Sequence, residues 1–419
     1  MSQQASATGF LPQDPRALGM GGTGVAVGNS RQAHYYNPSL LVNAREDEDF
    51  NFEIDLAIRY SDSDKLFQSA KDFADDDPFT KLGESIDALD LNDPTTFEAV
   101  SVASKNLRQS MQDVTGKSLT IDGNIGTFVS APNLKYSWAL YFNAWTNIGL
   151  TGIIGESDLD TMNGFIAITD GTFDQNTLTQ LTQDNPTLAG NLDSSIQIKG
   201  AGVREIGIAI ANKQTISNYD LDIGITPKIQ MVTTFGTLQS LQETEEETDP
   251  FDFKNTETTT SFNIDIGISK ELNEHWTTGL MIKNLIPYTY DVKEPAGTPA
   301  NIKFDDVKIS PSFRIGAGWR NDWISAGVDL DILKNEDIAS ETETQFLTVG
   351  GEFDVWLLQL RAGYRHNFAG DGGSGPSVGL GLYLLGLNVD VAAATNTLSP
   401  SDITEVDNAN VAAQIGFNW

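Results

Sequence analysis

Cysteine is absent from the 419 residues of the chain. Its absence excludes disulfide frameworks, thiolate metal sites and cysteine nucleophiles. Long apolar runs are also lacking: no stretch approaches the roughly 18 apolar residues that a membrane-spanning helix needs. The mean hydropathy is −0.24. A hydropathy scan would therefore suggest a soluble protein, but strands that alternate apolar and polar residues also average to near neutrality.

Basic residues are scarce, with 26 Lys and Arg against 58 Asp and Glu, for a formal net charge of −32. Such a field repels nucleic acid, so we expect no nucleic-acid partner. The acidity fits a solvated surface better than a dedicated cation site. The acidic strings at 75–77 and 245–247 lack the alternating ligand spacing of a calcium loop, and we expect neither a metal nor a cofactor.

Histidine occurs only three times, at His34, His275 and His366, far apart in the sequence. Neither an HExxH motif nor a GxSxG motif with partners at the right spacing is found. The glycine-rich run at 370–375 is not followed by a helix or a lysine, so it does not resemble a phosphate-binding loop. We expect no enzymatic activity.

The dominant pattern is alternation of apolar with polar or small residues. In 261–272, Phe262, Ile264, Ile266 and Ile268 occupy every second position, which predicts a strand with one apolar face. The same pattern predicts an all-β membrane barrel of 14 antiparallel strands, an even number as in single-chain bacterial barrels. The predicted strands are 49–61, 118–130, 133–147, 196–211, 218–234, 258–271, 275–288, 307–319, 322–333, 343–354, 356–367, 376–385, 387–396 and 409–419.

The connections between these strands alternate in length. A long connection (62–117) is followed by a short one (131–132) and another long one (148–195), and the order persists along the chain. Outer-membrane barrels have short periplasmic turns and long external loops. Helical spacing within 64–114 and 158–192 predicts helical insertions in two external loops. They could cap the barrel mouth or pack only on each other, and the sequence favours neither.

The end of the chain points to the same location. Val411, Ala413, Ile415, Phe417 and Trp419 share one strand face, which resembles the C-terminal sorting signal of outer-membrane barrels. We expect a bacterial outer-membrane protein that contacts membrane lipid and lipopolysaccharide as a monomer. The first residues have neither the basic segment nor the apolar core of a signal peptide, so we expect that the signal has been removed.

Residues 9–44 precede the first predicted strand and are rich in small residues. Their glycines permit unusual backbone angles and close packing, whereas apolar residues such as Leu18 and Val25 argue against a free tail. We expect a segment inside the barrel lumen. The predicted organisation is a hatch over 1–48 and a barrel over 49–419, with helical insertions near 62–117 and 148–195.

Three short stretches carry a family resemblance: 16–22 (RALGMGG), 24–27 (GVAV) and 36–40 (YNPSL). In these the chain resembles the FadL family of outer-membrane transporters for hydrophobic compounds. It is most similar to the FadL-related group labelled conjugal transfer TraF-like. That family has an Asn-Pro-Ala motif in its N-terminal hatch, and Ser39 stands here in place of the alanine.

The resemblance implies passive uptake of hydrophobic compounds such as long-chain fatty acids or hydrocarbons. An apolar ligand is stabilised by burial, at about 0.8 kcal/mol per CH₂. The hatch residues that would bind or gate the ligand are Gly19, Gly21, Gly22, Asn37, Pro38 and Ser39. A second hypothesis is a non-transporting barrel scaffold, or a surface or conjugation-related assembly protein of the same fold. A lipid-modifying barrel enzyme is the weakest, because no Ser–His constellation is found.

The resemblance also implies a lateral exit, made by an inward strand kink beside the hatch motif. The predicted strand 133–147 contains neither glycine nor proline, so a kink there would have to be forced by the hatch pressing on Asn143. Pro227 interrupts another predicted strand and cannot donate a ladder hydrogen bond. A local bulge and a lateral opening are both possible at Pro227, and we favour the bulge.

Overall fold

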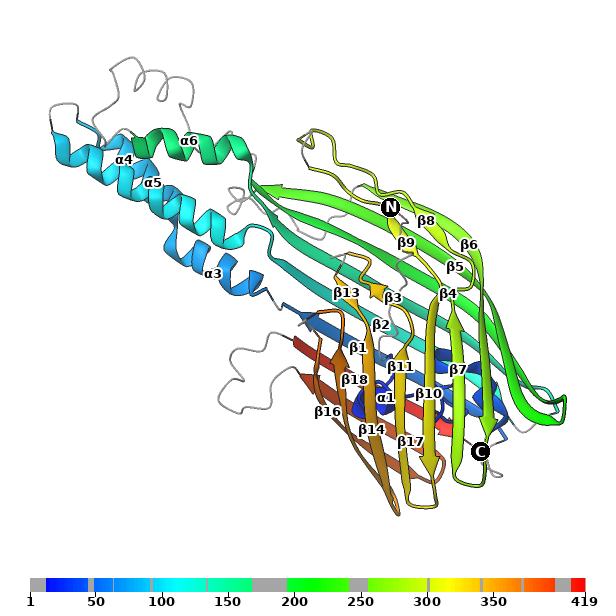
Figure 1. The fold of residues 1–419 in the computed structure, drawn as a ribbon. Coiled ribbons are helices and arrows are strands. Elements are labelled where there is room, and N and C mark those ends of the chain that lie inside the picture. The colour runs from blue at the N-terminus through cyan, green and yellow to red at the C-terminus, as the bar shows by residue number, and fades with distance from the viewer. Residues whose placement is uncertain are drawn as a thin grey trace.

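A computed structural model describes residues 13–43, 49–62, 64–90, 93–132, 135–167, 194–240, 255–299, 302–339, 342–370, 373–395 and 408–418. These residues form a closed barrel of 14 antiparallel strands (Figure 1). All 14 predicted strands are therefore confirmed. Trp419, the last residue of the predicted C-terminal strand, lies outside the described residues.

Around the barrel, each strand pairs with its neighbours, and β1 closes the wall by pairing with β18. The barrel strands are β1 (Asn51–Ser61), β2 (Ser118–Ala131), β3 (Ser137–Ile153), β4 (Ser195–Ile216), β5 (Tyr219–Ser240), β6 (Thr256–Glu271), β7 (Trp276–Lys283), β10 (Ser312–Arg320), β11 (Ile324–Asp331), β14 (Phe346–Val355), β15 (Leu358–Asn367), β16 (Gly375–Leu384), β17 (Leu387–Thr395) and β18 (Asn408–Asn418).

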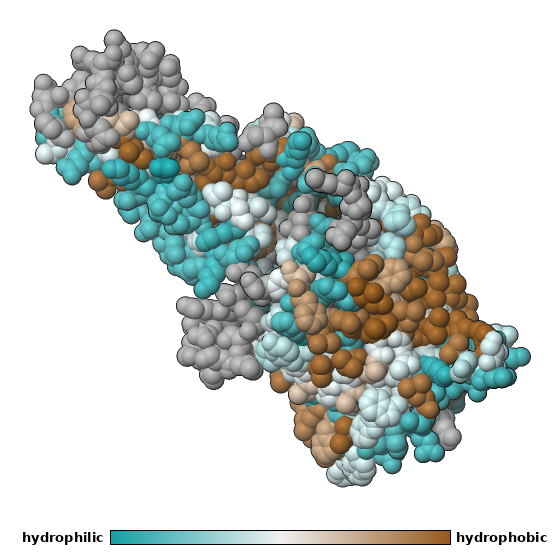
Figure 2. All heavy atoms as spheres, viewed as in Figure 1, coloured by the Kyte–Doolittle hydropathy of each residue, from teal (hydrophilic) through white to brown (hydrophobic). Residues whose placement is uncertain are grey.

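The period-two pattern determines which way each side chain points. In β1, Glu53 and Asp55 are buried on the inner face, whereas Ile54, Leu56 and Ile58 are 42%, 48% and 55% exposed on the outer face. Figure 2 shows the resulting apolar surface over the barrel wall. A continuous apolar outer face with a polar interior is what a transmembrane barrel presents to lipid.

The two ends of the barrel differ. At one end, called here the short-turn end, β4 joins β5 through Ser217–Asn218, and β14 joins β15 through Trp356–Leu357. Tryptophans gather at this end and come from five different strands or turns: Trp138, Trp276, Trp319, Trp323 and Trp356. Aromatic residues of this kind mark a membrane–water interface.

The opposite, long-loop end carries the helices. These are α3 (Leu66–Asp76), α4 (Pro78–Asp87) and α5 (Pro94–Val114) between β1 and β2, and α6 (Glu156–Ala167) after β3. They project from the barrel (Figure 1) and share an apolar core made of Leu82, Val100, Ala103, Leu107, Met111, Met162 and Phe165. The helices therefore pack on one another. Of the second predicted insertion, 168–192 lies outside the described residues.

None of the described helices is long and apolar enough to cross a membrane.

The barrel strands differ in length, and the pairing between strands shortens abruptly between β6 and β7. Their ladder runs only from Ile266–Ile282 to Glu271–Thr277, although β6 is 16 residues long. After Lys283 the chain turns at Asn284, whose φ is 53°. It then enters a small separate sheet of β8 (Tyr288–Tyr290) and β9 (Val307–Ile309).

Because the chain leaves the barrel wall at this turn, two predicted boundaries were wrong. The predicted strand 275–288 ends at Lys283, and the predicted strand 307–319 is divided between β9 and β10. The side chain of Asn263 in β6 takes over the backbone pairing at Ile286. Its NH₂ group donates to the carbonyl of Ile286, and its oxygen accepts from the N–H of Ile286, both at 3.0 Å. A second small sheet, β12 (Asn335–Glu336) with β13 (Glu343–Thr344), follows β11.

Candidate functional site in the barrel lumen

Residues 13–43, called here the lumen segment, lie against the inner wall of the barrel (Figure 1). The segment contains α1 (Pro15–Gly19), α2 (Ala33–Tyr36) and the 3-10 helix η1 (Pro38–Val42). Asp14 caps α1 by accepting hydrogen bonds from the N–H groups of Arg16 (2.9 Å) and Ala17 (3.1 Å), and Pro15 is pre-organised for the first helical position. Burial raises the pKa of the Asp14 carboxyl above its ordinary value.

Glycine allows the lumen segment to approach the wall backbone to backbone. A Cβ on Gly19 would lie 2.9 Å from the Cα of Gly379, and one on Gly21, whose φ is +73°, would lie 2.8 Å from the backbone of Tyr364. The glycines of the wall mirror this arrangement. On eight neighbouring strands from β5 to β16, a Cβ would meet the lumen segment at Gly224, Gly267, Gly279, Gly316, Gly318, Gly327, Gly350, Gly363 and Gly379. We call these nine residues the glycine belt.

Wall side chains also satisfy the backbone of the glycine-rich loop. Asp329 Oδ2 accepts hydrogen bonds from the N–H groups of Gly24 (2.7 Å) and Val25 (3.0 Å). Arg320 donates to the carbonyl of Val27 at 2.8 Å. Buried backbone groups need partners, and here the barrel supplies them. The loop is therefore held by a few polar side chains rather than by its own secondary structure.

A buried chain of charges connects α1 to three strands. Arg16 pairs with Glu352 of β14 at 2.7 Å. Glu352 also pairs with Arg361 of β15 at 2.6 Å, and Arg361 pairs with Asp390 of β17 at 2.6 Å. Nearby, Arg31 pairs with Glu53 of β1 at 3.2 Å. Removing one member of a buried pair leaves an uncompensated charge, so these contacts hold the lumen segment firmly.

The Asn-Pro-Ser motif is seated at β5, β6 and β7. The side chain of Asn37 caps η1 by accepting from the N–H of Ser39 at 3.1 Å, and it donates to the carbonyl of Val25 at 2.8 Å. Pro38 lies where Cβ atoms on Gly224 and Gly267 would be. The hydroxyl oxygens of Ser39 and Ser269 are 2.8 Å apart. Of the six motif residues singled out from the sequence, Gly19, Gly21, Asn37, Pro38 and Ser39 lie against strands of the glycine belt. The carbonyl of Gly22 accepts a hydrogen bond from Arg314 of β10 at 3.3 Å.

His34, which the sequence left without a role, is enclosed by aromatic rings. Its ring centroid lies 3.9 Å from that of Tyr35 and 4.2 Å from that of Phe128 on β2. Burial lowers the pKa of His34 to about 3. The imidazole is therefore neutral in the seated lumen segment at physiological pH.

Asn143 is buried on the inner face of β3 and meets the lumen segment. The Tyr35 hydroxyl donates to Asp55 at 2.9 Å, and its distance to the side-chain oxygen of Asn143 is 3.4 Å. The ladders of β3 with β2 and with β4 both continue across Asn143. The contact between the lumen segment and Asn143 therefore leaves the pairing of β3 unbroken.

Pro227 interrupts one ladder of β5. The β4–β5 pairing joins Gly207 to Lys228 and Ile210 to Ile225, and the two positions between them are not bridged. The offset is the same on both sides, so no residue is inserted. The bulge that the sequence favoured is therefore wrong. On its other side Pro227 remains paired with Ile264 of β6, so the interruption is confined to the edge with β4.

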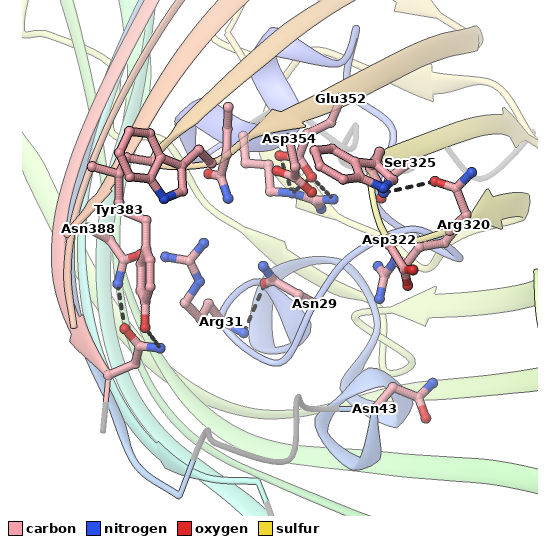
Figure 3. A pocket seen from close by; sticks show the side chains of 17 residues that line it. Asn29, Arg31, Asn43, Arg320, Asp322, Ser325, Glu352, Asp354, Tyr383 and Asn388 are labelled. Atoms are coloured by element: carbon pink, nitrogen blue, oxygen red, sulfur yellow. Dashed lines mark hydrogen bonds and ion pairs between the residues drawn. The ribbon is translucent and has the colours of Figure 1, made fainter. Parts of the chain in front are cut away.

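A polar pocket of about 640 Å³ lies beneath the lumen segment at the short-turn end (Figure 3). Arg16, Asn29 and Arg31 contribute to it from the segment, and residues such as Asp322 and Tyr383 contribute from the wall and turns. Sequence reasoning missed this pocket, because its lining comes from many separate strand ends. The only signal was the occurrence of polar residues on inward positions next to the turns.

The sequence matches the model of a family described as F plasmid transfer operon, TraF, protein, over residues 34–331. This is more than half of the chain. The chain belongs to this TraF family. Comparison with curated proteins gives no match.

Among solved structures, a deltaS2S3 mutant of the TodX monoaromatic hydrocarbon channel matches the TraF-family chain with a TM-score of 0.51. The identity is 10%, over 96% of this chain and 98% of that chain. The toluene transporter TodX of P. putida gives a TM-score of 0.49 and 11% identity, over 97% and 98%. At such identities the likeness establishes the fold alone, and the argument rests on the first match. The FadL-type barrel expected from the sequence is confirmed at that level.

Proposed function

We propose that this TraF-family barrel is an outer-membrane channel for the passive uptake of hydrophobic compounds, with the lumen segment acting as its hatch. The observation that carries the proposal is the seated segment itself. Its backbone fills the lumen against the glycine belt, and buried polar side chains fix it there. A barrel plugged in this way is poorly suited to free diffusion of water-soluble solutes. It suits ligands that pass by burial and by movement of the plug.

A buried apolar cluster inside the long-loop mouth supports the same proposal. The chain between β7 and β10 packs against inner-wall residues of β4 and β5 in one buried cluster, which includes Val203, Val232, Tyr290, Phe304 and Ile309. These side chains are buried against one another, so a hydrophobic compound would be buried among them, which is favourable, once the chain between β7 and β10 moved aside. The fold match to a monoaromatic hydrocarbon channel supports the same ligand class. Long-chain fatty acids remain a second candidate substrate.

The proposed gating residues are Gly19, Gly21, Gly22, Asn37, Pro38 and Ser39. Asn143 and Pro227 remain the candidates for a lateral exit. Pro227 is the better of the two, because the ladder beside it lacks two bridges, whereas both ladders at Asn143 are continuous. We also propose that the protein works as a monomer.

A reversible cross-link tests whether the hatch must move. The hydroxyl oxygens of Ser39 and Ser269 are 2.8 Å apart, and the chain has no cysteine. The double variant Ser39→Cys with Ser269→Cys should therefore form a disulfide between the hatch and β6. In cells whose outer membrane carries lipopolysaccharide, uptake of radiolabelled toluene should fall on oxidation and recover on reduction. The two single variants are the controls. Uptake that is unchanged in the oxidised double variant would contradict a moving hatch.

The scaffold hypothesis is kept because of two observations: the family description refers to a plasmid transfer operon, and helices α3 to α6 project from the barrel with their own core. On this hypothesis neither toluene nor a fatty acid should accumulate above the level of empty vesicles, and purified protein should carry no apolar ligand. Saturable uptake that depends on the protein would exclude a purely structural role.

A further inference from the structure

Two turns at the short-turn end place large apolar side chains in the open. Trp356, between β14 and β15, is 93% exposed, and Leu385, between β16 and β17, is 96% exposed. The next most exposed large apolar side chain of the described residues is Val378, at 62%. Because apolar surface of this kind is unfavourable in water, these two positions suggest an apolar or interfacial environment.

The backbone at both positions makes this choice of residue more unusual. Trp356 has a φ of 58° and Leu385 a φ of 51°. This left-handed region favours glycine, asparagine and aspartate, and it disfavours bulky side chains. The β4–β5 turn adopts positive φ as well, but there Ser217 and Asn218 occupy it. Tryptophan and leucine are thus present despite both local conformational preference and the cost of hydration.

The outer apolar face continues to these two turns without a polar collar. Val355 and Leu358 flank the first turn and are 39% and 44% exposed, and Leu384 beside the second turn is 44% exposed. On β4, by contrast, the outward positions beyond Ile210 are Asn212 and Gln214. Strands β14 to β17 therefore present an apolar, membrane-facing surface as far as their turns at the short-turn end.

Strand length accounts for the depth of these turns but not for their apolar residues, because β10 and β11, of 9 and 8 residues, are joined through Asn321 and Asp322. Strands β14 to β17 have 9 or 10 residues each, whereas β4 and β5 have 22. About 9–11 tilted residues are needed to cross the hydrocarbon layer. The short strands are just long enough to do so, which brings their turns to the boundary of the layer. The long strands carry their turn beyond it.

We propose that Trp356 and Leu385 insert into the lipid leaflet at the short-turn end and anchor strands β14 to β17 of the barrel there. The occupant of this surface is the lipid of the membrane that the barrel spans. The indole ring suits the boundary, because it combines a large apolar body with one N–H donor. Trp323, Trp356 and Leu357 also line the polar pocket.

Site-directed spin labels test the anchor in the full chain. Trp356→Cys, Leu385→Cys and the control Asn218→Cys are each labelled with a nitroxide and reconstituted into phosphatidylcholine vesicles. Collisions with oxygen, which concentrates in lipid, are compared with collisions with a water-soluble nickel chelate. The first two labels should favour oxygen, and the Asn218 label should favour the chelate. Chelate accessibility equal to that of the control at both turns would overturn the proposal, and it would favour a protein partner for these side chains.

Native fluorescence gives a second readout that needs no label. Trp356→Phe should remove emission that brominated lipid quenches, while leaving the part quenched by aqueous iodide unchanged. Loss of the iodide-quenched part instead would place the indole in water and overturn the proposal. Both readouts depend only on the barrel spanning the bilayer, so they remain informative whether or not the protein transports a ligand.

Discussion

Arg16 in α1 and Glu352 in β14 form a buried ion pair at 2.7 Å although 336 positions separate them in the sequence. The pair joins the lumen segment to the wall at the point where Glu352 also meets Arg361. It is therefore the most direct place at which to loosen the proposed hatch.

Arg16→Ala should weaken the seating of the hatch. The loss of one partner from a buried pair costs about 3 kcal/mol, although Arg361 still compensates part of the Glu352 charge. We expect a higher and noisier conductance in planar bilayers, with the barrel intact. The control is Lys71→Ala, which removes an exposed pair with Asp75 on α3 and should change nothing. Equal conductance in Arg16→Ala and wild type would show that the pair does not hold the plug.

Gly350→Ala tests the glycine belt. A Cβ at this position of β14 would overlap the backbone of Met20, and such overpacking typically costs 1–3 kcal/mol. The hatch should be displaced and small-solute leakage should rise in a liposome swelling assay. Gly202→Ala in β4 is a matched control, because nothing lies within 4 Å of a Cβ there. Identical leakage in the two variants would mean that the wall tolerates the added methyl group and that the belt is not a close seat.

Acidification should loosen the hatch through His34. The pKa of His34 is lowered to about 3 by burial, and a free histidine has a pKa near 6.5. Below about pH 6.5 the His34 imidazole binds a proton in the unseated segment but not in the seated one. The stability of the seated state therefore falls as the pH decreases towards 3. Leakage should therefore increase between pH 7 and pH 5.

The variant His34→Phe isolates this contribution. The variant should lose the increase in leakage between pH 7 and pH 5. Asp14 cannot mimic the effect, because burial raises its pKa and acid then favours the seated state. Leakage that rises with acid equally in the variant and in wild type would assign the pH dependence to other groups.

Pro227→Val should restore a donor to the interrupted β4–β5 ladder. If the two unbridged positions form the exit, uptake of the hydrophobic substrate should fall while the barrel becomes slightly more resistant to heating in SDS. Ile223→Val, on the same outward face of β5 but within the continuous part of the ladder, is the control. Wild-type uptake by Pro227→Val would remove this proline from the exit route.

The strands could be predicted because alternate residues face the lipid and the polar lumen, which gives the sequence a period of two. The end of β7 could not be predicted in this way. Apolar residues continue through Leu285 and Ile286, so the pattern extends beyond Lys283, but Asn263 of β6 draws this stretch inward. The residues at 284–288 do not themselves indicate that Asn263, some 20 residues earlier in the chain, will bond this stretch.

The lumen contacts were only half predictable. Small residues in the N-terminal stretch indicated close packing, and glycines on inward positions such as Gly267 and Gly327 were visible in the strands. Their meeting is a tertiary relationship. The offset between Gly350 and Met20, for example, depends on the register of every strand between β1 and β14. The same holds for the pocket beneath the hatch, whose arginines are separated in sequence from the turns they face.

The glycine belt has a mechanical consequence. At the nine belt positions the wall is bare backbone, so no wall side chain there has to move before the hatch can be displaced. Displacement is opposed by buried contacts, which include the ion pair of Arg16 with Glu352, the hydrogen bonds to Asp329 and the apolar contact of Val25 with Met281. The degree of opening should therefore depend on how many of these contacts are broken at a given moment, rather than on repacking of wall side chains at the belt.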